Sequence, residues 1–363
     1  MSAESAGPRA LAALTDERVF GLLARDPATR TEISAQLGIS KPTASQSILR
    51  LQEFGLVSEG RSSAEGKRGR IPERYALRTA YGHVLGVDLS AERLALRASD
   101  LAGTVLAERS SPVATSTGAE QLLDTARALR DELQAELGTR RLATGISQAA
   151  PVLHAGNGAA RVVPTPIFAA SGADLAGLFD ARSTLLDNDV NWMAVAEYAG
   201  RAGSLLLLYL GAGIGSALVI EGRLYRGRHG LVGELETQRL QGRTLLEHLD
   251  AGGLVDTRVL FEKLSDPQLW PALIEPLGQV LGNLLGYLDP DALVVTGPGA
   301  SAALTQKLAD RLAGLVPLAG PDIEYSPQGG SGALDGALAV ARRYALAEVW
   351  IAYRQWQPGR PCH

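Results

Sequence analysis

The sequence predicts an α/β protein in which a small, mainly helical head precedes a larger body made of two related α/β halves. Three observations carry this prediction. The chain has 363 residues, of which 46% are hydrophobic and 20% charged, as is typical of soluble folded proteins with more than one core. Apolar residues at helical spacing dominate residues 16–51. From Val84 onward, short apolar strands alternate with helices, and one series of strands recurs.

Charge separates the head from the body. Residues 1–80 hold 12 Lys/Arg and 9 Asp/Glu, whereas the rest of the chain holds 23 and 30, so the head is basic and the body acidic. The single cysteine, Cys362, excludes an intrachain disulfide and a cysteine-based zinc site. The longest apolar run, residues 205–210, is too short to cross a membrane, and the chain starts without a secretory signal. We expect a cytoplasmic protein with no membrane partner, metal or cofactor.

The head begins with three predicted helices. Residues 16–24 form the first, and the second follows Thr31 and ends at Gly38, a natural left-handed cap. Ser40 can cap the third, because its hydroxyl can accept the backbone N–H of Thr43. Apolar residues at spacings of four and three turn one face of this helix inward: Ala44, Ile48 and Leu51. The opposite face carries side chains that can reach bases and phosphates in a major groove: Lys41, Thr43, Ser45 and Gln46.

A basic hairpin is predicted after the third helix. Leu56 and Val57 begin a strand, and residues 75–77 can return it. Residues 61–78 hold six cations against two acidic residues, a density that suits phosphate binding: Arg61, Lys67, Arg68, Arg70, Arg74 and Arg78. A solvated surface loop is the default interpretation of such a segment by itself.

The head as a whole also has an alternative interpretation, a helical hairpin used only for packing or dimerisation. Packing alone explains neither the cations nor the polar helix tip. The head is therefore predicted to be a winged helix-turn-helix that binds double-stranded DNA. The expected DNA-binding residues lie on the third helix and in the wing: Ser40, Lys41, Thr43, Ser45, Gln46, Lys67, Arg68 and Arg70.

The body contains two similar series of predicted strands. Each series has three strands and a tight turn and is followed by helices that alternate with further strands. The first series comprises residues 84–89, 94–98 and 104–108, and the second comprises residues 205–210, 216–220 and 223–225. This repetition predicts two α/β subdomains of similar design on either side of a cleft.

Residues 31–45, with the sequence TEISAQLGISKPTAS, closely resemble the helix-turn-helix of ROK-family repressors (repressor, open reading frame, kinase). Gly69-Arg70-Ile71-Pro72 resembles the family's Gly-Arg-x-Pro wing, in which the arginine can enter a narrow minor groove. The resemblance runs through nearly the whole chain. It implies a winged helix-turn-helix over residues 1–80, followed over residues 81–363 by two actin-like, ribonuclease-H-like α/β subdomains that sense a ligand and dimerise.

Two segments resemble the phosphate loops of the family but depart from them. Residues 86–92, Gly-Val-Asp-Leu-Ser-Ala-Glu, occupy the place of the first loop, usually Asp-x-Gly-Gly-Thr. Asp88 survives there in a structural or functional role, but Ser90-Ala91-Glu92 crowds and repels a nucleotide phosphate. Residues 211–215, Gly-Ala-Gly-Ile-Gly, resemble the second loop, commonly Gly-Thr-Gly-Ile-Gly. The missing threonine hydroxyl also argues against phosphoryl transfer.

Two further segments resemble the sugar site of the family. Residues 187–191, Asp-Asn-Asp-Val-Asn, match Asn-Asp-x-Asn, which holds sugar hydroxyls and supplies the base in the kinases, although such a pair alone is usually a turn or a cap. Residues 230–237 match Gly-x-x-Gly-Glu-Ile-Gly-His with Glu236 for glycine and Thr237 for the zinc-binding histidine. The family's cysteine segment is absent, so the zinc is expected to be lost. The resemblance implies these ligand-binding residues: Asn188, Asp189, Glu234 and Glu247.

Three functions remain open on this evidence. The first is a homodimeric or larger repressor of carbohydrate-related genes that a sugar or sugar derivative releases from its operator, with no catalytic residues. The second is an active sugar kinase with a DNA-binding head, which Asp189 keeps open and Ser90-Ala91-Glu92 disfavours. The third is a regulator that binds no sugar and uses the body for dimerisation or for another effector, which the lost zinc segment and Glu236 favour.

Overall fold

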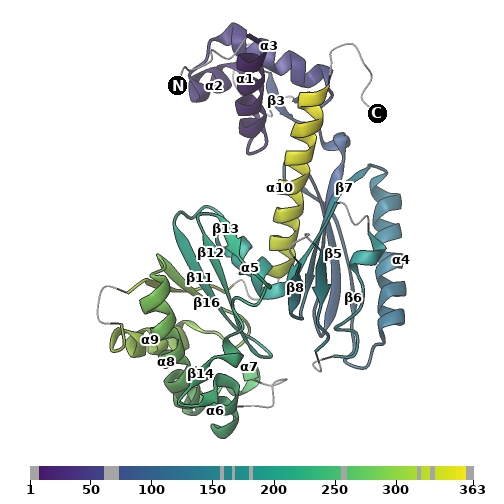
Figure 1. Cartoon of the computed structure of the whole chain (residues 1–363). Coiled ribbons are helices and arrows are strands. Elements are labelled where there is room, and N and C mark those ends of the chain that lie inside the picture. The colour runs from purple at the N-terminus through teal and green to yellow at the C-terminus, as the bar shows by residue number, and fades with distance from the viewer. Residues whose placement is uncertain are drawn as a thin grey trace, which may run out of the picture.

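The computed structural model describes residues 8–60, 73–155, 159–165, 168–179, 183–254, 260–316, 320–327 and 332–356. A helical head lies at one end of the molecule, and two lobes lie at the other (Figure 1). The last helix, drawn in yellow, runs from between the lobes into the head. Within the described residues, no helix is long and apolar enough to cross a membrane.

The head contains three helices and a small antiparallel sheet. The helices are α1 (Pro8–Leu23), α2 (Arg30–Leu37) and α3 (Lys41–Glu53). The sheet has the order β1-β3-β2, with β1 (Ala28–Thr29), β3 (Arg74–Leu77) and β2 (Val57–Gly60). Three apolar residues of α3 are buried as predicted: Ala44, Ile48 and Leu51. The predicted winged helix-turn-helix is thus present, with β2 and β3 as the strands of the wing.

The start of α2 differs from the sequence prediction. Thr29, and not Thr31, caps the helix, because the Thr29 side chain accepts the backbone N–H of Glu32 at 3.2 Å. The Glu32 carboxylate accepts the backbone N–H of Thr29 in return at 2.7 Å. This reciprocal pair satisfies two amides that the first turn of a helix would otherwise leave without partners. Gly38 ends the helix in the left-handed conformation, as expected.

The first lobe is built on a five-stranded sheet in the order β10-β7-β4-β5-β6. Its strands are β4 (His83–Leu89), β5 (Arg93–Asp100), β6 (Val105–Pro112), β7 (Arg141–Gln148) and β10 (Thr184–Asn188). Helix α4 (Ala119–Leu137) covers its outer face (Figure 1). A small hairpin of β8 (Val152–His154) and β9 (Ala160–Val162) follows β7.

The second lobe repeats this topology in the order β13-β12-β11-β16-β17. Its strands are β11 (Ser204–Leu210), β12 (Ile214–Ile220), β13 (Arg223–Tyr225), β16 (Ala292–Thr296) and β17 (Asp322–Tyr325). A helical layer covers its outer face: α6 (Leu245–Ala251), α7 (Leu260–Lys263), α8 (Trp270–Leu288) and α9 (Ala302–Ala313). A hairpin of β14 (Arg239–Leu240) and β15 (Arg243–Thr244) precedes α6. In each lobe three antiparallel strands lead into two parallel ones, which confirms the predicted pair of related subdomains.

Each lobe sends its final helix across to the other lobe. Helix α5 (Asp189–Glu197) follows β10 of the first lobe, yet its apolar side chains pack against β11 and β12 of the second. Helix α10 (Gly332–Gln355) follows β17 of the second lobe and packs on β4 and β7 of the first. The two helices meet at Gly336, where a Cβ would lie 1.8 Å from the carbonyl oxygen of Trp192. Only glycine permits this backbone approach.

The far end of α10 belongs to the core of the head. Trp350 stacks on Phe20 of α1 with ring centroids 5.6 Å apart, and Tyr353 packs edge-on against Phe54 after α3 at 5.3 Å. The Tyr353 hydroxyl donates a hydrogen bond of 2.6 Å to the buried carboxylate of Asp16. The head and one end of α10 therefore form a single apolar cluster.

Candidate nucleic-acid interface and ligand site

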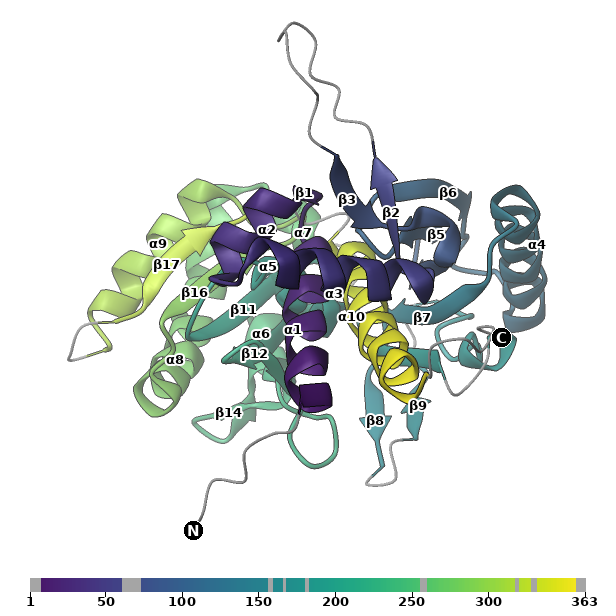
Figure 2. The ribbon, with the colours of Figure 1, turned by 90° about the horizontal axis from the view of Figure 1, so that it is seen from above.

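The outward face of α3 begins with a capped turn. The Ser40 hydroxyl accepts the backbone N–H of Thr43 at 3.2 Å, as predicted, and lies 2.8 Å from the Thr43 hydroxyl. These two hydroxyls therefore fix the start of the helix. Lys41 and Gln46 are exposed and Ser45 is half-buried on the same face. Seen from above, α3 crosses over the end of α10 (Figure 2).

Sequence reasoning missed one residue of this face. Leu49 is 59% exposed, although its neighbours Ile48 and Leu51 are buried. It lies three residues after Gln46 and four after Ser45, which places all three on one side of the helix. This helical spacing, measured from the predicted polar tip, is the signal that could have found it. The predicted wing residues Lys67, Arg68 and Arg70 lie outside the described residues.

The candidate ligand site begins where the parallel strands of the first lobe end. Asp88, Ser147 and Asp187 are paired across β4, β7 and β10, and Asn188 is the last residue of β10. The carboxyl ends of parallel strands are the usual place for ligands in α/β sheets. Asn188 caps α5, because its Oδ1 accepts the backbone N–H of Val190 at 2.9 Å while its Nδ2 donates to the Ala150 carbonyl at 3.1 Å.

The charge of one carboxyl group at this edge acts on another. Burial, and then the nearby charge of Asp88, raise the pKa of Asp189 to about 7. Burial also raises the pKa of Asp88. Tyr209, at the end of β11 in the second lobe, has a pKa raised by its burial and by the charges of the same two carboxylates. The charges of Asp88 and Asp189 in the first lobe therefore act on Tyr209 of the second lobe.

The second lobe contributes a glycine loop and two glutamates. Gly215 of the loop contacts the start of α5, since a Cβ there would lie 2.8 Å from Val190 Cγ2. The Glu236 side chain contacts the same loop, because its Oε1 accepts the backbone N–H of Ile214 at 2.9 Å. Burial, and then the charge of Glu236, raise the pKa of Glu234. The name interlobe site is used below for six residues: Asp88, Asn188, Asp189, Tyr209, Glu234 and Glu236.

Two contacts fix the backbone beside Glu234. Gly233 has a φ of 106°, and a Cβ on it would lie 1.9 Å from the Ser216 carbonyl oxygen. The backbone N–H of Ser216 donates to the Gly233 carbonyl at 3.1 Å. Glycine is therefore required next to this glutamate.

Glu247 is engaged at the start of α6. Its carboxylate accepts the backbone N–H of Thr244 at 2.6 Å, and the Thr244 hydroxyl accepts the Glu247 N–H at 3.1 Å. The first cause of its lowered pKa is that backbone hydrogen bond. Asn188 and Asp189 lie at the start of α5, which contacts the glycine loop, and Glu234 lies two residues before Glu236 on the other side of that loop. Asn188 and Glu247 both cap helices, and Glu247 lies apart from the other predicted ligand residues, at the start of α6.

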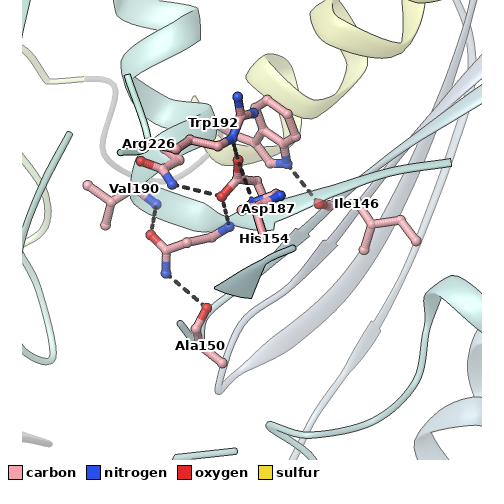
Figure 3. Close-up of polar contacts among 9 residues, drawn as sticks. Ile146, Ala150, His154, Asp187, Val190, Trp192 and Arg226 are labelled. Carbon is pink, nitrogen blue, oxygen red and sulfur yellow. Dashed lines mark hydrogen bonds and ion pairs between the residues drawn. The ribbon is translucent and has the colours of Figure 1, made fainter. Parts of the chain in front are cut away.

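A buried carboxylate beside the site joins the two lobes. Arg226, from the loop after β13, and His154 of β8 both point toward Asp187 (Figure 3). Asn191 Nδ2 also donates to Asp187 at 2.7 Å. Burial alone would raise the pKa of Asp187, but the nearby His154 ring, the charge of Arg226 and the hydrogen bonds from Asn191 and Arg226 outweigh it and hold the pKa low. Sequence reasoning missed this network because its members are far apart in the chain.

Arg226 is held from a second side as well. Its guanidinium lies over the Trp192 ring, 5.6 Å from the centroid, and the Trp192 indole donates 2.7 Å to the Ile146 carbonyl (Figure 3). This tryptophan therefore connects the arginine to the sheet of the first lobe. Among the residues that the structure describes, no group of three or more His, Cys, Asp or Glu side chains could hold a metal ion.

Comparison with known protein families identifies both parts of the chain. Residues 84–241 match the ROK family, and residues 19–59 match the bacterial regulatory protein family of arsR type. An N-acetyl-D-glucosamine kinase from Escherichia fergusonii is 31% identical over 217 residues, which cover 47% of this chain and 71% of the kinase.

Two further relatives carry a regulator's name. A putative xylose repressor from Caldicellulosiruptor sp. is 26% identical over 215 residues, covering 57% of this chain and 53% of that protein. The crystal structure of a ROK family transcriptional regulator, a homolog of the E. coli MLC protein, has the same fold, with a TM-score of 0.64 and 16% identity over 94% of this chain and 98% of that one. The predicted family is thereby confirmed: the chain belongs to the ROK family and carries a bacterial regulatory helix-turn-helix at its amino-terminal end.

Proposed function

We propose that this protein is a transcriptional regulator whose head binds an operator and whose interlobe site binds a sugar or sugar derivative that controls DNA binding. The observation that carries the proposal is α10, a single helix that takes part in both regions. Near its beginning, Gly336 contacts the backbone of α5 at Trp192, three residues after Asp189. Near its end, Trp350 and Tyr353 lie in the core of the head.

A ligand can act on the head through this helix. The side chains of Asn188, Asp189 and Glu234 are suited to sugar hydroxyls, because carboxylates accept two hydrogen bonds each and an amide both donates and accepts. A ligand that contacts both lobes favours one arrangement of the lobes over another. Since α5 and α10 touch through their backbones, a shift of α5 displaces α10 and with it the head.

The regulator acts as a homodimer and as a repressor in this proposal. Two recognition helices must lie about 34 Å apart to enter successive major grooves on one face of DNA, so a modest rotation of one head abolishes simultaneous binding. The match to a protein named as a putative xylose repressor supports repression and a sugar effector. The DNA-contacting residues are those of the exposed face of α3 together with Lys67, Arg68 and Arg70 of the wing.

The first phosphate loop supports a function without catalysis. The Ser90 hydroxyl accepts the backbone N–H of Arg93 at 3.1 Å and that of Glu92 at 3.4 Å, so this turn satisfies its own amides.

An active sugar kinase is the second candidate, favoured by the identity to the N-acetyl-D-glucosamine kinase and by the pKa of Asp189 near 7, which suits a base. Sugar-dependent ATP consumption that Asp189→Ala abolishes would establish the kinase instead.

The effector and the operator can be found with the full-length protein. A duplex is selected from a random library, and sugars, sugar phosphates and nucleotides are screened by thermal shift, because a ligand of the folded state raises the melting temperature. The effector found is then titrated against operator complexes. Asp189→Asn should bind DNA normally without the effector but should resist release by it.

An exposed carboxylate of α9 provides the control for this titration. Asp310→Asn makes the same substitution at an exposed position of α9, which is not part of the interlobe site, and should be released like the wild type. Equal release of the Asp189→Asn protein would show that the interlobe site does not carry the signal. In that case the alternative regulator, which binds no sugar and uses the body for dimerisation or another effector, would be favoured.

A further inference from the structure

The glycine loop of the second lobe is covered by side chains of the protein itself. A Cβ on Gly213 would lie 2.6 Å from Oε1 of Glu236. A Cβ on Gly211 would lie 2.3 Å from Cε1 and 2.6 Å from the hydroxyl oxygen of Tyr209. Both glycines through which a phosphate could approach the backbone are therefore in contact with a polar side chain of this chain.

The contact with Glu236 reproduces the chemistry of anion binding. Glycine loops hold anions through backbone N–H groups that point at the ligand. Here the N–H of Ile214 donates at 2.9 Å to Oε1 of Glu236, and a carboxylate oxygen accepts this hydrogen bond as a phosphate oxygen would. The loop is closed on the other side by the Gly211 N–H, which donates to the Gly213 carbonyl at 3.0 Å.

Glu236 is held in this position by its neighbours. It lies in a single 3-10 turn, Leu235–Thr237, in which Leu235 is buried. The Thr237 hydroxyl donates 2.8 Å to the Glu234 carbonyl and closes the turn. A packed and hydrogen-bonded turn therefore holds the Glu236 carboxylate against the loop.

The charges around the loop also oppose an anion. Glu234 lies close enough to Glu236 for their charges to interact, and the charges of Asp88 and Asp189 act on Tyr209, which lies against Gly211. Burial raises the pKa of Glu236 even though the Ile214 N–H favours its charged form. A phosphate dianion would enter among these carboxyl groups and would compete with one of them for its hydrogen bond.

We propose that Glu236 is a specificity-determining residue that occupies the anion position of the glycine loop, so that the interlobe site takes neutral or cationic hydroxylated ligands and excludes phosphorylated ones. This inference rests on the proposed function for the role of the ligand. The exclusion of phosphate itself is a property of the loop and can be tested without an effector or an operator.

The test measures the binding of inorganic phosphate and pyrophosphate to the full-length protein by calorimetry and thermal shift at constant ionic strength. Glu236→Gly removes the side chain, and Glu236→Gln keeps its size and its acceptor oxygen but removes the charge. The wild type should show no saturable binding of either anion. Glu236→Gly should bind pyrophosphate at least about tenfold more tightly than Glu236→Gln, and Glu236→Gln more tightly than the wild type.

Two results would overturn the proposal: saturable binding of pyrophosphate by the wild type, or no gain of binding in a Glu236→Gly protein that melts cooperatively. Glu236→Ala serves as a second variant if the added backbone freedom of glycine disturbs the turn. Operator binding by the same proteins in phosphate-free buffer is measured separately. If the wild type does not bind DNA, the proposed function is contradicted, but the conclusion about pyrophosphate binding stands.

Discussion

Helices α5 and α10 occupy equivalent places in the two lobes but differ in length and in what they reach. Each follows the last strand of its own sheet and crosses to the other lobe. Helix α5 has 9 residues and ends between the lobes, whereas α10 has 24 and continues into the core of the head. One helix of the symmetric pair thus joins the head to the lobes, and motion of one lobe relative to the other can reach the DNA-binding helix.

The residues of the sheets that these helices cover also differ between the two lobes. In the first lobe, Gly86 and Gly145 are paired on β4 and β7, and α10 approaches their backbones. In the second lobe, the equivalent pair is Leu207 and Val294 on β11 and β16, whose side chains pack with those of α5. Backbone contact leaves less freedom to slide than contact between side chains. We therefore expect the first lobe, α10 and the head to shift together when the two lobes move relative to one another.

The largest expected effect on stability comes from Gly145→Ala, which adds a methyl group to the face of the first lobe's sheet that α10 covers. A Cβ at Gly145 would lie 2.0 Å from the Ala337 carbonyl oxygen, so Gly145→Ala forces α10 off the sheet. We expect a loss of roughly 3 kcal/mol in the free energy of unfolding, measured by urea denaturation.

A glycine within another helix provides the matched control. A Cβ at Gly286 of α8 would meet nothing within 4 Å outside its own helix, so Gly286→Ala should stabilise the protein by about 1 kcal/mol. Equal stability of Gly145→Ala and the wild type would mean that α10 does not depend on this close approach. The comparison between the two helices would then lose its structural basis.

The next effect concerns the contact between α10 and the head. The carboxylate of Asp16 accepts hydrogen bonds from Arg50 at 2.9 and 2.6 Å and from the Tyr353 hydroxyl at 2.6 Å. Tyr353→Phe keeps the stacked ring but removes a donor to a buried charge. The free energy of unfolding should fall by about 2 kcal/mol. Tyr287→Phe removes the same atom from a ring that is 89% exposed on α8 and should change nothing measurable.

The sequence predicted contacts between near neighbours much better than contacts between distant ones. The Ser40 cap and the buried face of α3 followed from spacing alone. The interlobe network of Asp187 and the bond from Ile214 to Glu236 join residues 39 and 22 positions apart, and no local pattern fixes such pairs. The double role of α10 was missed for the same reason.

Two local signals were present in the sequence and were not used. A threonine followed three residues later by glutamate predicts a capping box. This pattern occurs at Thr29 and Glu32, where it would have given the correct start of α2. It occurs again at Thr244 and Glu247, where it indicates the capping role that the structure gives to Glu247. The family resemblance implied that Glu247 binds a ligand, but helix capping by itself also explains a glutamate at this position.

A smaller effect should appear in the pH dependence of stability. The pKa of Asp189 is raised to about 7, first by burial and then by Asp88, whereas the unfolded chain has a value near 4. The group therefore stabilises the fold at low pH, and this contribution is lost as the pH rises through about 7. The stability of the wild type relative to Asp189→Asn should decline between about pH 4 and pH 7 and should be constant above that range.

The difference between the two proteins isolates this group. His83 has a pKa lowered by burial to about 4, which makes stability rise over the range between that value and about 6.5, but the residue is present in both proteins and cancels. A constant difference between wild type and variant across pH 5 to 8 would show that Asp189 is ionised throughout. The close pairing of carboxyl groups in the interlobe site would then be wrong.

The smallest effect should come from Leu49 on the exposed face of α3. An apolar side chain in a major groove can contact the methyl group of thymine. Each thymine of the selected operator is replaced in turn by deoxyuridine, which removes only that methyl group. At one position the wild type should lose about 1 kcal/mol of binding free energy, and Leu49→Ala should lose none there because the contact is already absent. Leu14→Ala truncates a leucine of similar exposure on α1 and should respond to each replacement as the wild type does. If Leu49→Ala keeps the full wild-type response at every thymine, the exposed leucine does not read the DNA.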